Sequence, residues 1–235
     1  VTARFGERLF KKFFKTYTEK VWGIPCSRIS ADWAAQRIRN LSLREAVKNA
    51  LLAQAGMGGN SSVTSLIEQF HYPRLGPGMM WEALAEKIED KGSRIQYGSR
   101  VVRIKHRDKR VFSAVIKKGE TEKEVALSCC ISSMPLAELI SSLDPPAPRS
   151  VIEAADKLGY RDYIAVNLVI DKDHLFPDNW IYVHDPIVEL GRIQNYKNWS
   201  PDMVPVEGKS VLGLEYFHFE TDPEWDWDDD RLIER

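Results

Sequence analysis

The order of hydrophobic patterns along the chain constrains its fold more than any single motif does. Apolar residues recur at helical spacing through most of residues 1–90. Residues 93–131 and 160–220 instead carry short alternating apolar stretches, bounded by glycine, proline and polar residues, as β-strands do. The sequence therefore predicts an α+β fold, with a helical part followed by mixed or antiparallel sheets.

Local signals place the individual elements. A capping box of Ser42 and Glu45 starts a helix over 43–52, a shorter helix is expected over 32–39, and Gly92 ends a helix that begins after the turn PRLGPG. Strands are expected at 95–97, 101–105, 111–116 and 125–131, and, beyond a rigid PPAP linker and a helix over 149–158, near 160–170, 180–184, 191–196 and 211–219.

Three aromatic residues stand in the run FFKTYTEKVWGIPC near the start of the chain. Phe13 and Tyr17, four residues apart, share one face of a helix, and Trp22 lies where Gly23 and Pro25 end it. Packing in a core is one interpretation of such a stripe, and a ligand-binding wall is the other.

Composition excludes several classes of function. The 33 basic and 34 acidic residues nearly cancel, so neither nucleic acid nor an anionic membrane surface is an expected partner, and no apolar run is long enough to span a membrane. Three cysteines and five scattered histidines lack metal-ligand spacing, so we expect reduced thiols, a cytoplasmic location and no metal site. The acidic run EWDWDDD at 224–230 is expected to face solvent and complement a helix dipole.

The chain opens and closes within helical patterns, so we interpret it as a piece of a longer polypeptide. It has no GxGxxG fingerprint, because the glycines in AGMGGNSS follow a helix and not a strand. That tract, at 54–62, is expected to form a surface loop.

The run YTEKVWG resembles the signature helix of UDP-galactopyranose mutases, a branch of the superfamily that also holds flavin amine oxidases and protoporphyrinogen oxidase. The resemblance implies that Phe13 and Tyr17 sandwich a uracil ring and that Trp22 lines the sugar pocket. GYRDYIAVNLVID at 159–171 resembles the mutase strand whose arginine, here Arg161, reaches the diphosphate. GRIQNYK and LEYFHF resemble two further strands of the mutase sheet.

Val101 and Ile104 match the VxxI pattern of the strand that returns to the FAD domain in this superfamily, and ISSMP at 131–135 matches a strand end beside the flavin. The resemblance implies that the backbone of Val101 contacts adenine and that Met134 and Pro135 lie near the flavin. FAD is therefore expected in the full-length protein, but not in this piece alone.

The same resemblance implies three parts: a helical substrate subdomain at 1–92, a β segment at 93–135 that rejoins the FAD domain, and an antiparallel substrate domain at 136–235. The two β regions then belong to different sheets. The mutases carry a mobile arginine-bearing loop where this chain has 54–62 and PRLGPGMM; Arg74 is a candidate stand-in for its arginine, but the different spacing prevents an alignment. This departure leaves the sugar open.

Three functions follow. The first is mutase chemistry, in which reduced FAD contracts the ring of a UDP-sugar; the second is an FAD-dependent oxidoreductase of amine oxidase or protoporphyrinogen oxidase type. The third is a non-catalytic ligand-binding module on the same scaffold. No side chain is an obvious acid or base, so the catalytic residues are unknown, which fits a reaction performed by the cofactor.

Overall fold

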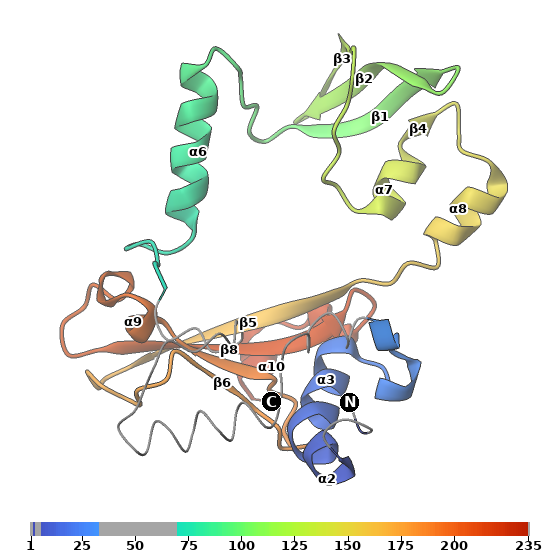
Figure 1. Ribbon diagram of the computed structural model, residues 1–235. Coiled ribbons are helices and arrows are strands. Elements are labelled where there is room, and N and C mark those ends of the chain that lie inside the picture. The colour runs from blue at the N-terminus through green and yellow to red at the C-terminus, as the bar shows by residue number, and fades with distance from the viewer. Residues whose placement is uncertain (1, 3–5, 33–69, 235) are drawn as a thin grey trace, which may run out of the picture. The chain divides into compact units, whose positions relative to one another are not determined.

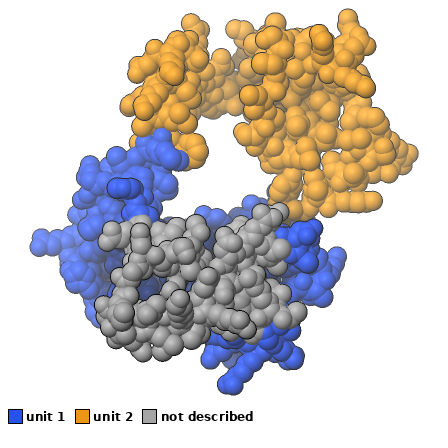
Figure 2. Space-filling model, in the orientation of Figure 1, with its two compact units in different colours: residues 1–80, 161–235 blue, residues 81–160 orange. Residues whose placement is uncertain are grey.

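The structure is a computed structural model that describes residues 2, 6–32 and 70–234. The chain divides into two compact units, one formed by 1–80 with 161–235 and the other by 81–160 (Figure 2). The three-part division expected from the sequence places its boundaries elsewhere and stays a prediction. The helices expected over 32–39 and 43–52, and the loop at 54–62, lie outside the described residues or at their edge.

The first unit begins with a continuous helical segment made of α2 (Glu7–Leu9), the π-helix η1 (Phe10–Lys15) and α3 (Thr16–Trp22). The π-helical winding in the middle differs from the regular α-helix that the aromatic spacing predicts. The segment ends where expected, at Gly23, whose left-handed backbone (φ 64°) lets its N–H donate to the Glu19 carbonyl at 2.8 Å. A short 3₁₀ turn, η2 (Cys26–Arg28), follows.

The sheet of this unit has four antiparallel strands in the order β5-β8-β7-β6 (Figure 1). They are β5 (Arg161–Ile170), β6 (Trp180–Tyr182), β7 (Arg192–Asn195) and β8 (Ser210–Phe219), joined or followed by α9 (Tyr196–Trp199), η3 (Pro201–Met203), η4 (Pro223–Asp226) and α10 (Asp229–Ile233). The four strands expected from the sequence are confirmed, with small shifts at their ends.

Cross-strand pairing fixes which side chains share a face of this sheet. Tyr182 lies opposite Arg192, and Arg192 lies opposite Glu215. Residues directly opposite each other point to the same side. One face of the sheet therefore carries an aromatic ring, a guanidinium and a carboxylate in a row.

The second unit holds a separate sheet in the order β3-β2-β1-β4. Its elements are β1 (Arg100–Arg107), β2 (Arg110–Lys118), β3 (Thr121–Ala126), α7 (Leu136–Ser141), β4 (Leu143–Asp144) and α8 (Arg149–Ala155), preceded by α6 (Gly78–Asp90), which starts at the end of the first unit. The expectation of two different sheets is confirmed. The strand predicted over 125–131 is wrong, because β3 pairs with β2 four residues earlier and ends at Ala126.

Tight turns join these strands. Asp108 and Lys109 both have positive φ angles (51° and 62°), and such a two-residue turn matches the twist of an antiparallel pair. Ile104, Ala114 and Val115 form the buried centre of the sheet. Gly92 follows the last residues of α6 and ends the helix as predicted. Its φ angle is positive (83°), and its N–H donates to the Glu89 carbonyl at 2.8 Å.

The acidic run at 224–230 only partly faces solvent. Asp228 caps α10 as expected, since its side chain accepts a hydrogen bond from the Arg231 N–H at 2.9 Å. Glu224 is only 8% exposed, so the prediction of a solvated side chain is wrong there, because η4 folds back against β8. Among the residues described, no helix is long and apolar enough to cross a membrane.

Candidate functional site

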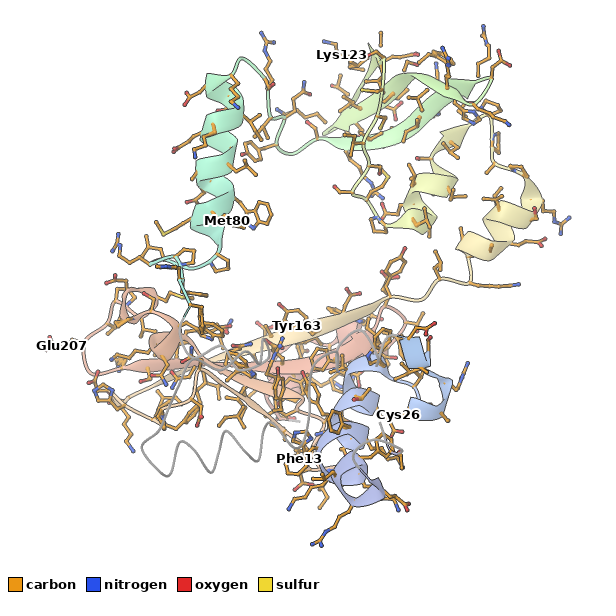
Figure 3. The ribbon with its side chains drawn as sticks, viewed as in Figure 1. Phe13, Cys26, Met80, Lys123, Tyr163 and Glu207 are labelled. Carbon is orange, nitrogen blue, oxygen red and sulfur yellow. The ribbon has the colours of Figure 1, made fainter. Side chains whose placement is uncertain are left out.

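A cavity of about 1090 Å³ lies in the first unit, between the N-terminal helical segment and the sheet. Figure 3 labels two residues of its lining: Phe13, within that segment, and Cys26, in the turn η2 that follows it. The lining combines aromatic side chains with a few polar groups; among its members are Phe10, Phe13, Phe14, Tyr17, Val21, Trp22, Tyr182, His184 and Arg192. Phe13, Tyr17 and Trp22 therefore meet at one cavity, and we find that Arg161 is not part of its lining.

The aromatic wall of the cavity joins α3 to the strand β6 and the loop after it. The Tyr17 ring lies 4.5 Å from that of Tyr182 and 5.8 Å from that of His184, measured between centroids. Phe13 meets His184 edge-on at 6.1 Å and stays 51% exposed. Since Tyr17 is only half-buried and Phe13 is open, these rings form a wall and not a sealed core.

Burial controls the protonation of the wall. It raises the pKa of Tyr17 to about 12, with smaller contributions from Arg192, which lowers it, and from Tyr182 and Glu215. Burial, and then the nearby Lys20 ammonium, lower the pKa of His184. The Nδ1 atom of His184 is buried and has no hydrogen-bond partner in the described structure. The wall thus offers a protonated phenol and a neutral imidazole.

Arg192 brings a positive charge to the cavity, and its guanidinium is held by Glu215 on the neighbouring strand β8. Nε of Arg192 donates to Oε2 of Glu215 at 2.7 Å, and Nη2 lies 2.5 Å from the same oxygen. Burial lowers the pKa of Arg192, but the hydrogen bond and charge of Glu215 outweigh it and raise that pKa overall. Gln194 donates to the other oxygen of Glu215 at 3.0 Å and accepts from Trp199 Nε1 at 3.0 Å. The carboxylate therefore fixes the guanidinium in place.

Lys20 fastens the loop after β6 to α3. Its Nζ donates to the carbonyl oxygens of Val183, Asp185 and Leu190, at 3.0, 2.7 and 3.0 Å. Burial lowers the pKa of Lys20 while Asp185 raises it, and the net direction is downward. One ammonium thus holds His184, which lies within this loop, beside the helix that carries Tyr17.

Arg161 lies at the C-terminal end of α3. Its guanidinium donates to the carbonyls of Lys20 and Val21 at 3.0 and 3.3 Å, and to that of Phe217 at 2.6 Å. The carbonyls at the end of a helix lack partners within it, and a cation there also complements the helix dipole. Arg161 therefore caps the helix that supplies the aromatic wall. Its predicted contact with a diphosphate stays a prediction.

The residues predicted to contact FAD lie in the second unit. Val101 pairs with Ile116 of β2, and β4 pairs only with Ile104 and Lys105, so the first half of β1 has no described strand on its other side. A register shift between Val101 and Arg103 adds a bulge there. An open strand edge offers backbone N–H and C=O groups, as the predicted adenine contact requires.

Met134 and Pro135 follow β3. Met134 is half-buried, its N–H lies 3.4 Å from Ser132 Oγ, and Pro135 precedes the first residue of α7. Arg74, the stand-in for a loop arginine, pairs with Asp202 at 3.3 Å, and both side chains are largely exposed. Cys26, Cys129 and Cys130 carry free thiols, as expected.

Tyr182, His184 and Arg192 are the site residues that the sequence analysis missed. The segment GRIQNYK had been noted as a strand of the sheet, but not for its arginine. The alternation within it gave a usable signal, because Arg192 and Gln194 point to the same face.

A family model for flavin containing amine oxidoreductases matches residues 4–235. The chain belongs to this family. Among solved structures, reduced UDP-galactopyranose mutase matches with a TM-score of 0.74 at 21% identity, over 99% of this chain and 48% of the mutase. A protein from Exiguobacterium sp. 255-15 named for protoporphyrinogen oxidase matches with a TM-score of 0.65 at 14% identity, over 100% of this chain and 48% of that one.

An oxidoreductase from Methanosarcina mazei also shares the fold, with a TM-score of 0.55 at 14% identity, over 88% of this chain and 58% of that chain. The chain thus spans about half the length of the solved proteins it matches. The expected superfamily and fold class are confirmed.

Proposed function

We propose that the full-length protein is an FAD-dependent enzyme that binds a nucleotide-sugar and is most like UDP-galactopyranose mutase. The observation that carries this proposal is the meeting of Phe13, Tyr17 and Trp22 with Arg192 around one cavity. Aromatic faces bind a nucleobase by stacking, and a guanidinium binds phosphate oxygens through paired hydrogen bonds. The fold shared with a solved mutase supports the assignment.

Arg192 is the group that we assign to the diphosphate. Its Nε and Nη2 both face Glu215, and Nη1 forms no hydrogen bond or ion pair with a described residue, which leaves that edge of the guanidinium for a ligand. Arg161 has a smaller capacity for this role, since its Nε and Nη2 already serve three backbone carbonyls. His184 lines the same cavity beside the stacking wall, and its buried Nδ1 has no hydrogen-bond partner among the described residues.

FAD, when bound, would supply the nucleophile that contraction of a sugar ring requires. On this chain, the backbone at Val101 would hold the adenine edge, and Met134 and Pro135 would lie near the flavin ring. The residues around the cavity would bind the nucleotide, neutralise its diphosphate and exclude water. The chain lacks the glycine-rich phosphate loop, so we expect FAD in the full-length protein only.

An oxidoreductase of amine oxidase or protoporphyrinogen oxidase type is the second candidate. It is supported by the family that the chain belongs to and by the shared fold of the Exiguobacterium protein. In that case the same cavity would accept an oxidisable substrate, and UDP would have no affinity for it.

The test is a calorimetric titration of the full-length protein with UDP, with the flavin spectrum recorded before and after reduction by dithionite. We expect UDP to bind the wild type, and Arg192→Ala to weaken binding at least tenfold, which corresponds to about 1.4 kcal/mol. Arg149→Ala is the control, because Arg149 is exposed and its one ion pair within the described part of the chain is with Glu153. A wild type that does not bind UDP would favour the oxidoreductase.

A further inference from the structure

A second group of polar side chains lies where β8 ends and none of its members lines the cavity. His218 belongs to β8, Asp222 is the third residue after the strand, and Glu224 lies in η4. His218 and Glu224 are each 8% exposed. Burial of a charge is costly unless an opposite charge or an ion compensates it, and this imidazole and carboxylate lie close enough to share one ion.

Two of the distances within this group are close to those between ligands of one metal ion. Nδ1 of His218 lies 3.6 Å from Oδ2 of Asp222 and 3.5 Å from Oε2 of Glu224, and the three ligand atoms all lie within 4.8 Å of one another. These separations exceed the roughly 2.7–3.2 Å of a hydrogen bond. Two atoms that bind one tetrahedral ion at about 2.0–2.1 Å are about 3.3–3.4 Å apart.

The backbone, and not a ligand, holds these groups in place. Asp222 Oδ2 accepts the Phe219 N–H at 2.7 Å, and the Asp222 N–H donates to the Phe219 carbonyl at 3.0 Å, which closes the turn after β8. Trp225 Nε1 donates to the same carbonyl at 2.7 Å, and its ring meets that of His218 edge-on at 6.5 Å. The site is therefore formed before any ion arrives.

We propose that His218, Asp222 and Glu224 bind one divalent transition-metal ion, with Zn²⁺ as the best match. One imidazole nitrogen and two carboxylate oxygens suit Zn²⁺ better than Mg²⁺ or Ca²⁺, and three protein ligands leave a fourth position for water. The two carboxylates offset the charge of the ion. Arg161, 3.6 Å from Asp222, weakens this attraction, so the nitrogen ligand has to supply much of the affinity.

The competing arrangement is a protonated His218 that bridges the two carboxylates without any ion. With Arg161 counted, the protonated bridge is neutral and the ion-bound group carries one positive charge. Only the ion-bound arrangement predicts saturable, stoichiometric binding of a metal. The bound ion would tie the end of β8 to η4 and stabilise the folded state by mass action.

The test is calorimetry with Zn²⁺ and absorption spectroscopy with Co²⁺ on the full chain. Cys26, Cys129 and Cys130 are replaced by serine in every sample, because free thiols also bind these ions. We expect one ion per chain and a rise of the melting temperature with Zn²⁺. His218→Ala and Glu224→Gln should each weaken binding at least tenfold, and His174→Ala should not change it, because His174 is exposed and pairs with Asp173 at 2.9 Å.

Absence of saturable binding in the wild type would overturn the proposal in favour of the protonated bridge. Binding that survives both His218→Ala and Glu224→Gln unchanged would overturn it as well. Circular dichroism checks that each variant is folded; if His218→Ala is not, the nearly isosteric Glu224→Gln decides. If Glu224→Gln binds UDP as tightly as the wild type does, the metal site does not contribute to nucleotide binding. A failure of one proposal then says nothing against the other.

Discussion

Arg161 Nη2 donates to the backbone carbonyl of Lys20 at 3.0 Å, across 141 residues of sequence, and so joins the start of β5 to the end of α3. The guanidinium also lies 4.2 Å from the centre of the Phe219 ring. The last carbonyls of the helix that lines the cavity therefore receive their hydrogen bonds from a strand that is distant in the sequence.

Arg161→Ala is expected to lower the free energy of unfolding by at least about 2 kcal/mol, because three carbonyls lose a charged donor. Arg161→Lys should recover little of this stability, since an ammonium lacks the planar set of N–H donors that a guanidinium offers. Denaturant unfolding measures both, with the exposed Arg149→Ala as a control near zero. If Arg161→Ala unfolds like the wild type yet binds UDP poorly, then the predicted role at the diphosphate is the correct one.

Tyr17→Ala in the full-length protein is expected to weaken UDP binding about tenfold or more, since stacking of a base on an aromatic ring contributes roughly 1–3 kcal/mol. Tyr17→Phe keeps the ring and should retain most of the affinity. Tyr97→Ala, at a position that is 69% exposed in the other unit, serves as the control. Equal affinities for the wild type and Tyr17→Ala would mean that the base does not stack there.

Gly23→Ala is expected to destabilise the fold more than Gly119→Ala does. Both residues have positive φ angles, 64° and 56°, so both substitutions strain the backbone. At Gly23 the added Cβ would also lie 2.5 Å from the Phe219 ring and 2.9 Å from the Arg161 guanidinium, whereas Gly119 has open space. The extra cost should be about 1–3 kcal/mol by denaturant unfolding. Equal losses of unfolding free energy in the two variants would show that the Phe219 ring and the Arg161 guanidinium move aside at no cost.

The stability that Tyr17 contributes should disappear in alkali. Because burial raises its pKa from 10.0 to about 12 in the folded state, the folded protein holds this proton more tightly than the unfolded chain does. The contribution is complete below pH 10 and is lost as the pH rises toward 12. We expect the difference in unfolding free energy between the wild type and Tyr17→Phe to shrink over this range. A difference that stays constant with pH would place the phenol in open water.

Local signals in the sequence predicted most elements because short-range chemistry determines them. Gly23 and Gly92 end helices through their positive φ angles, and alternation revealed the four strands of the β5–β8 sheet. The π-helical winding of η1 has no such signal, since nothing in FKKFFK distinguishes it from an α-helix. The end of β3 was misplaced because apolar residues continue after Ala126, although the strand ends there and the Leu127 N–H makes one last bond to β2, at the Phe112 carbonyl.

The candidate site was predicted on its helical side and missed on its sheet side. Phe13 and Tyr17 follow from spacing within one helix, but the pair of Arg192 and Glu215 depends on how β7 meets β8, 23 residues apart. Arg161 was assigned a ligand, while its neighbours in space, the end carbonyls of α3, are invisible in a linear sequence. Long-range polar partners are decided by tertiary packing, not by local pattern.

The three hydrogen bonds from Lys20 to the loop 183–190 restrict where His184 can move. With three carbonyls bound to one ammonium on α3, the ring of His184 cannot travel away from Tyr17 unless that ammonium releases its acceptors. Tyr17 and His184 therefore stay side by side in one wall of the cavity, and the position of that wall is set before a ligand arrives. A ligand ring would meet a preformed aromatic surface, so little ordering of the protein would be needed for it to stack there.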